Sequence, residues 1–128
     1  MLSGDLGAGK TSFARGLIQA LCGNLEVASP TFMLLQTYDT ENVCIHHYDL
    51  YRIKHIEELY ELGIEEQIGC SILLVEWPEM AGEFDWGRDR LDIHIQHESE
   101  QTRSLRFTAS KSMLPALDKM KALFDDKT

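Results

Sequence analysis

The chain has 128 residues, with 21 acidic against 12 basic residues and a formal net charge of −9. Proteins that grip nucleic acid by themselves normally present a basic face, so this acidic balance argues against that class. The hydrophobic fraction of 44% is ordinary for a globular protein, and no apolar run approaches the roughly eighteen residues of a membrane span. We therefore expect a single small domain over residues 1–128 that has no membrane segment.

Residues 4–11 read Gly-Asp-Leu-Gly-Ala-Gly-Lys-Thr, which fits the phosphate-loop pattern G-x-x-x-x-G-K-S/T at every position. The glycines leave out Cβ atoms where a polyphosphate must approach the backbone N–H groups, and the following helix adds the positive end of its dipole. We expect Lys10 to reach the β- and γ-phosphates as a catalytic residue and Thr11 to bind Mg²⁺. The predicted nucleotide-binding residues are Asp5, Leu6, Gly7, Ala8, Gly9, Lys10, Thr11 and Ser12.

Apolar residues at helical spacing follow the loop and predict a helix over residues 12–22, which Gly23 ends. They are Phe13, Leu17, Ala20 and Leu21. Only residues 1–3 precede the loop, although a phosphate loop should follow a buried parallel strand of ordinary length. We expect either a stub of that strand or a protein that begins further upstream, and we favour the second.

The rest of the chain reads as alternating strands and short helices. A continuous apolar run at 71–75 predicts a strand buried on both faces, and alternation at 91–96 and 104–109 predicts strands with one wet face. The other predicted elements are strands at 34–38 and 43–49 joined as a hairpin, helices at 56–62, 64–68 and 113–124, and a frayed tail at 125–128. The predicted fold is α/β, a three-layer arrangement of the phosphate-loop NTPase kind around a mixed, mainly parallel sheet, lacking an N-terminal helix and most of the phosphate-loop strand.

Two acidic residues follow predicted strands and are candidates for the metal side of the site. Glu76 ends the most hydrophobic run, where a Walker-B-like carboxylate belongs, and Asp49 ends the strand that starts at Val43. Ligands gather outside the carboxyl ends of strands in an open α/β sheet, so both acids should lie on the phosphate-loop side. We expect Glu76 to bind Mg²⁺ together with Thr11. His47 points to the same side of its strand as Asp49, so either could orient the other.

Further candidates carry weaker signals. Thr31 lies in the Ser-Pro-Thr-Phe stretch at 29–32, and a hydroxyl loop of this kind can reach Mg²⁺ or the γ-phosphate. Either Thr31 or Asp49 would then position the attacking water, as a catalytic residue, and the residues do not say which. Trp77 either stacks on a base or packs in the core, with the core as the default. Three widely spaced cysteines (Cys22, Cys44 and Cys70) read as buried, reduced thiols and favour a cytoplasmic location.

Taken together, these motifs resemble the TsaE family, small bacterial ATPases. The resemblance covers about residues 2–80 and rests on the phosphate loop, 29–32, His-Tyr-Asp-Leu-Tyr-Arg at 47–52, Glu-Leu-Gly at 61–63 and Glu-Trp-Pro-Glu at 76–79. It implies ATP and Mg²⁺ as cofactors and a role in making threonylcarbamoyladenosine in tRNA. It also implies that the TsaD and TsaB proteins are the partners, that the ATPase cycle resets this pair, and that tRNA is met only through it.

The resemblance assigns family roles to Lys10, Thr11, Thr31, Asp49 and Glu76. The sequence departs from the family at the start, where members usually carry a further helix and a full strand. We therefore expect residues 1–128 alone to be poorly soluble or to bind ATP weakly. Recognition of adenine rests on the resemblance, because no Asn-Lys-x-Asp guanine reader is apparent.

Two other functions stay open on this sequence. A small-molecule kinase would need a lid of arginines, for which Arg88 and Arg90 are the candidates. A nucleotide-dependent interaction module would bind without appreciable turnover. Negative charge, small size and the lack of a long lid favour an ATPase switch or such a module over a kinase. No arginine finger is obvious, so intrinsic hydrolysis should be slow.

Overall fold

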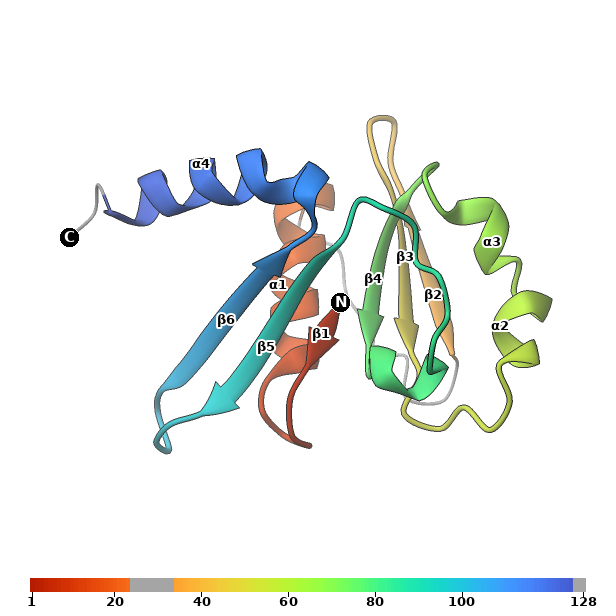
Figure 1. Cartoon of the computed structure of the whole chain (residues 1–128), viewed down its shortest axis with the longest axis horizontal. Coiled ribbons are helices and arrows are strands. Elements are labelled where there is room, and N and C mark those ends of the chain that lie inside the picture. The colour runs from red at the N-terminus through yellow and green to blue at the C-terminus, as the bar shows by residue number, and fades with distance from the viewer. Residues whose placement is uncertain (24–33, 126–128) are drawn as a thin grey trace.

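The computed structural model describes residues 1–23 and 34–125 (Figure 1). Its strands are β1 (Leu2–Ser3), β2 (Leu35–Asp39), β3 (Cys44–Asp49), β4 (Ile72–Glu76), β5 (Leu91–His97) and β6 (Arg103–Ala109). Its helices are α1 (Lys10–Cys22), α2 (Glu57–Glu61), α3 (Ile64–Gln67) and α4 (Leu114–Asp125), with 3-10 turns η2 (Pro78–Ala81) and η3 (Lys111–Met113). The predicted strands and helices in the described ranges are therefore present, with bounds that move by one or a few residues.

All six strands form one sheet in the order β2-β3-β4-β1-β5-β6. The four inner strands β3, β4, β1 and β5 run parallel to one another, and the outer strands β2 and β6 pair antiparallel to their neighbours. This arrangement confirms the α/β prediction with a mixed, mainly parallel sheet. Because inner parallel strands end at one edge, the ends of β1, β3 and β4 lie close together there.

The short strand β1 lies in the centre of the sheet. Leu2 is fully buried and pairs with Glu76 of β4 on one side and Ile93 of β5 on the other. The Met1 amino group donates a 2.8 Å hydrogen bond to the Leu91 carbonyl, and burial lowers the pKa of that amino group. Backbone bonds from both neighbours thus hold a two-residue segment extended, which its own length and composition would not do.

Two apolar clusters lie on opposite faces of the sheet and make three layers. Strand residues alternate between them, as Ile45 and Tyr48 of β3 and Leu74 and Val75 of β4 do. The cluster against α1 includes Leu2, Ala14, Ile18, Ile45, Leu74, Ile93 and Ile95, and the cluster against α2 and α3 includes Tyr48, Leu50, Leu59, Ile64, Val75 and Trp86. Burial on both faces explains why β4 reads as a continuous apolar run.

Some expected burial is wrong. In α1, Ala14 and Ile18 are fully buried and Phe13 and Leu17 of the predicted apolar set pack beside them, whereas Leu21 of that set is 45% exposed. The cysteines are not buried either, since Cys22 and Cys44 are half-buried and Cys70 is exposed. Within residues 1–23 and 34–125, no helix combines the length and the apolarity that crossing a membrane requires.

Candidate functional site

The phosphate loop joins the end of β1 to the start of α1. Gly4 and Gly9 have φ angles of 144° and 112°, which favour glycine, and a Cβ on Gly4 would lie 2.3 Å from the Ile95 carbonyl oxygen. A Cβ on Gly7 or Gly9 would instead meet nothing within 4 Å, so the loop leaves open space there. Since α1 begins at Lys10, its unpaired N-terminal amides border that space. The cradle formed by residues 5–12 therefore has the open space and the N–H groups that suit an anion.

Lys10 is held tightly beside the loop. Its side chain is 5% exposed, and Nζ donates hydrogen bonds to the carbonyl oxygens of Gly4 (2.7 Å) and Asp5 (2.8 Å). Nζ also lies 4.2 Å from the centre of the Trp77 ring. Burial lowers the pKa of Lys10, and the Glu76 carboxylate opposes that shift most strongly. The cation is thus fixed at the loop by neutral oxygens and a ring face, and it has no ion pair within residues 1–23 and 34–125.

Glu76, at the end of β4, receives one hydrogen bond on each carboxylate oxygen. The Thr11 hydroxyl donates to Oε1 at 2.8 Å, and His47 Nε2 donates to Oε2 at 2.7 Å. The exposed fractions of His47 and Glu76 are 0% and 2%. The structure therefore brings together Lys10, Thr11 and Glu76, which the sequence singled out from segments 65 residues apart.

Asp49 lies beside this group, at the end of β3 and opposite Glu76 in the parallel register. Its Oδ1 accepts the Tyr51 backbone N–H at 3.1 Å, and burial raises the pKa of Asp49 while that bond opposes the rise. We expected His47 and Asp49 to orient each other, but the hydrogen bond of His47 goes to Glu76 instead. The reason is the register, which places the Glu76 carboxylate on the face that His47 already occupies.

The structure adds two residues to the site. Trp77 is the only non-glycine residue of the described ranges with a positive φ, 58°, and it is half-buried between Lys10 and the Tyr51 ring, whose centre is 5.0 Å away. Trp77 also packs against the cluster that includes Tyr48 and Val75, as our default of a core Trp expected, but that default did not predict the contact with Lys10. Arg103, at the start of β6, donates from Nε to the Ala8 carbonyl at 3.0 Å. Nothing in the sequence near Arg103 signals that contact, since the two residues are 95 positions apart.

One predicted catalytic residue is not placed. Thr31 and the rest of its loop fall in residues 24–33, outside the described residues. Among residues 1–23 and 34–125 there is no group of three or more His, Cys, Asp or Glu that would hold a metal by itself. Mg²⁺ still fits, because it is usually bound by one or two protein groups together with substrate phosphates. The Thr11 hydroxyl hydrogen is used by Glu76, which leaves its oxygen lone pairs for a cation.

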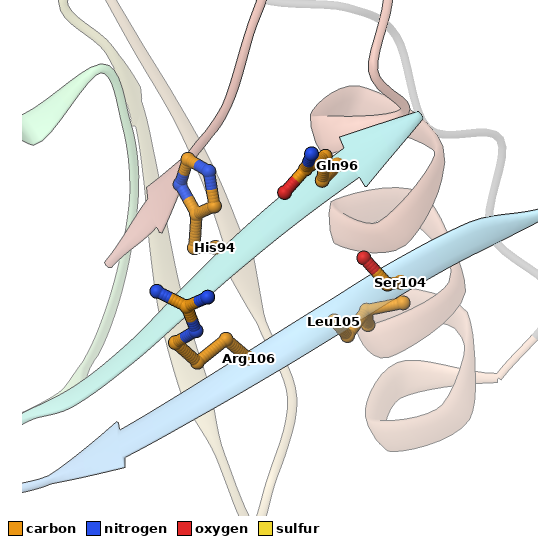
Figure 2. Close-up of a pocket in the computed structure, with 5 residues that line it drawn as sticks. All are labelled: His94, Gln96, Ser104, Leu105 and Arg106. Carbon is orange, nitrogen blue, oxygen red and sulfur yellow. The ribbon is translucent and has the colours of Figure 1, made fainter. Parts of the chain in front are cut away.

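A separate hollow of about 260 Å³ lies on the β5–β6 hairpin (Figure 2). Its lining residues are His94, Gln96, Ser104, Leu105 and Arg106. His94 and Gln96 alternate with the core residues Ile93 and Ile95, so they point away from α1. The hollow includes none of the predicted site residues.

The sequence matches a known protein family and several of its members. Residues 1–105 match the family described as "Threonylcarbamoyl adenosine biosynthesis protein TsaE". The tRNA threonylcarbamoyladenosine biosynthesis protein TsaE of Rickettsia felis is 57% identical over 81 residues, which make up 62% of this chain and 47% of that relative. The protein of the same name from Bacillus subtilis is 37% identical over 109 residues, or 84% of this chain and 67% of the relative.

The fold comparison agrees with these matches. The crystal structure of Bacillus subtilis YdiB gives a TM-score of 0.69 at 27% identity, covering 97% of this chain and 76% of that one. The match to the Haemophilus influenzae TsaE, 44% identical, takes in 50% of that protein, so the chain spans about half the length of several curated relatives. With 105 of its 128 residues inside the family match, the chain belongs to the TsaE family of threonylcarbamoyl adenosine biosynthesis proteins.

Proposed function

We propose that the chain binds ATP with Mg²⁺ at the phosphate loop, hydrolyses it slowly, and serves the threonylcarbamoyladenosine modification of tRNA in the cytoplasm by acting on the TsaD–TsaB pair. The observation that carries the proposal is the convergence of Lys10, Thr11 and Glu76 at the glycine cradle. Family membership supplies the pathway. The acidic charge of −9 favours an indirect contact with tRNA through protein partners.

Each residue of the site would have a separate role in the reaction. The loop amides and Lys10 would bind the β- and γ-phosphates and stabilise negative charge that grows during phosphoryl transfer. Thr11 and Glu76 would hold Mg²⁺, directly or through water, and the ion would supply further charge neutralisation at the phosphates. Asp49 has the position and the burial-raised pKa of a group that can orient a water or accept its proton. Thr31 is the other candidate for that task.

Two features support slow turnover. Lys10 must give up its bonds to Gly4 and Asp5 before it can reach a phosphate, and each such bond has to be replaced. In addition, the guanidinium of Arg103 is bonded to backbone carbonyls of Ala8, Ser99 and Thr102. A partner that rearranges these contacts would raise the rate, which is the behaviour of a switch. The kinase alternative is weaker, because its candidate Arg90 is already bonded to Asp92.

ATP turnover by the purified chain, alone and with the TsaD–TsaB pair, tests this proposal. We expect low turnover alone and stimulation by the pair, both lost in Lys10→Ala and kept in Lys54→Ala, which changes an exposed lysine. Transfer of the phosphoryl group to a small metabolite would favour the kinase. Tight nucleotide binding without any turnover, even with the pair present, would favour the interaction module.

A further inference from the structure

We propose that His47 is a positioning residue: by holding Oε2 of Glu76 it fixes Oε1 against Thr11 and so sets the protein's side of the Mg²⁺ site. This inference rests on the proposed function and goes beyond it, since His47 would touch neither nucleotide nor metal. It is carried by the two hydrogen bonds on Glu76, of 2.8 Å and 2.7 Å, one on each oxygen of the carboxylate.

The direction of the bonds explains how the positioning works. An ionised carboxylate only accepts, so the hydrogen between His47 and Glu76 lies on Nε2. A glutamate side chain has three rotatable torsions, and a donor on one oxygen alone leaves the carboxylate free to rotate about the last of them. The second donor removes that freedom. Because His47 is on β3 and Glu76 on β4, adjacent strands of the sheet, the holding group is itself rigid.

Burial supports a functional reason for this histidine. His47 is fully buried, and its other ring nitrogen, Nδ1, has no hydrogen-bond partner in the part of the chain that the structure describes. A buried unpaired polar atom opposes folding, and an apolar side chain at this position would avoid it. Residues that break a folding rule in this way tend to be at functional sites. The unpaired Nδ1 therefore fits a histidine that serves its bond to Glu76.

The consequence reaches the metal through Thr11. The Thr11 hydroxyl has a single hydrogen, and while Glu76 accepts it the oxygen lone pairs face the other way. Loss of His47 lets the carboxylate turn and the hydroxyl rotate with it. Changes to groups that hold metal ligands typically weaken metal affinity by about 10- to 100-fold. Binding of the phosphates by the loop amides and Lys10 does not depend on His47.

The test is calorimetric titration of ADP at several MgCl₂ concentrations and in EDTA, for the wild type and His47→Leu. We expect the half-saturating Mg²⁺ concentration to rise by about 10- to 100-fold in His47→Leu, with ADP affinity in EDTA unchanged. His47→Gln should restore the wild-type Mg²⁺ dependence, because its side-chain amide offers a donor at the reach of Nε2. The matched control is His46→Leu: His46 is the next residue of β3, and its ring nitrogens lie near Thr37 and Cys44.

Each outcome decides the matter. Wild-type Mg²⁺ dependence in a folded His47→Leu, or an equal loss in His46→Leu, overturns the inference. If His47→Leu does not fold, His47→Gln is compared with His47→Asn, whose side-chain amide is one bond shorter. Equal half-saturating Mg²⁺ concentrations in the two variants overturn the inference. A higher half-saturating Mg²⁺ concentration in His47→Asn alone supports it. Failure of the proposed function looks different, because the wild type itself would then show no Mg²⁺-dependent affinity for ADP.

Discussion

Two contacts of similar length, one at the end of β4 and one at the start of β5, differ in burial. Glu76, at the end of β4, is 2% exposed and bonded to His47 at 2.7 Å, whereas Arg90 and Asp92, at the start of β5, are each 38% exposed and bonded at 2.9 Å. Water screens the second pair, so it contributes less than a buried pair of the same bond length. The first pair must replace lost hydration with well-aimed partners. Burial rather than bond length therefore distinguishes the His47–Glu76 contact from the Arg90–Asp92 contact.

The largest effect on activity should come from a change in the buried site at the phosphate loop. Lys10→Ala removes the cation that would meet the phosphates, and we expect ATP turnover to fall by about 100- to 1000-fold, as when a donor that stabilises transition-state charge is lost. The measurement is phosphate release at saturating ATP, with circular dichroism as the check on folding. A folded Lys10→Ala protein with normal ATP turnover would contradict the assignment of the phosphate loop as the site of hydrolysis.

Asp49→Asn, in the same site, should lower activity while it raises stability. Because burial raises the pKa of Asp49 from 3.8, the folded state binds this proton more tightly than the unfolded chain. The free energy of unfolding then falls as pH rises from the ordinary carboxyl pKa through the raised one. At neutral pH we expect Asp49→Asn to melt higher than wild type and to turn over ATP about 100-fold more slowly.

The pH dependence supplies the control for that prediction. Below pH 3.8 both forms are uncharged at position 49, so the difference in melting temperature should shrink towards zero. A variant that melts lower than wild type at neutral pH and keeps its turnover would contradict both halves of the argument.

An intermediate effect is expected where the β5–β6 hairpin touches the loop. Arg103→Ala removes the bond to the Ala8 carbonyl, and loss of one such hydrogen bond should weaken nucleotide affinity by about three- to tenfold. Arg106→Ala is the matched control, since Arg106 lies on the same strand but lines the hollow of Figure 2. Equal affinities for the two variants would mean that Arg103 does not shape the loop.

The smallest effect belongs to the exposed pair. Asp92→Ala breaks the contacts with Arg90, and we expect the free energy of unfolding to change by less than about 1 kcal/mol, with nucleotide affinity unchanged. Urea denaturation followed by fluorescence measures the first quantity and calorimetry the second. A change in the free energy of unfolding well above about 1 kcal/mol would mean that burial is not what distinguishes the two contacts.

Local pattern predicted much of the fold. The helix after the phosphate loop, the hairpin of β2 and β3 and the buried strand β4 each have a local signal of their own, so the sequence predicts them without reference to distant residues. Strand β1 has no such signal, because two residues become a strand only through bonds to β4 and β5. The exposure of Leu21 near the end of α1 was not predicted for a similar reason, since packing against the sheet decides which apolar residues of the helix are buried.

The site divides in the same way. Lys10, Thr11 and Glu76 were predictable because a loop motif and a strand end each mark a residue type at a definite position. The bond between His47 and Glu76 was not, because it depends on the register of two strands 29 residues apart. Trp77 over Lys10 depends on a left-handed backbone conformation that sequence pattern does not favour for a bulky residue.

A crystal structure of the chain with Mg²⁺ and a non-hydrolysable ATP analogue tests the central claim most directly. We predict that the β- and γ-phosphates lie against the amides of residues 7–11, that Lys10 Nζ has left the carbonyls of Gly4 and Asp5 for the phosphates, and that Thr11 Oγ1 is a ligand of Mg²⁺. A nucleotide bound away from the glycine cradle, for example in the hollow on the β5–β6 hairpin, would contradict the account.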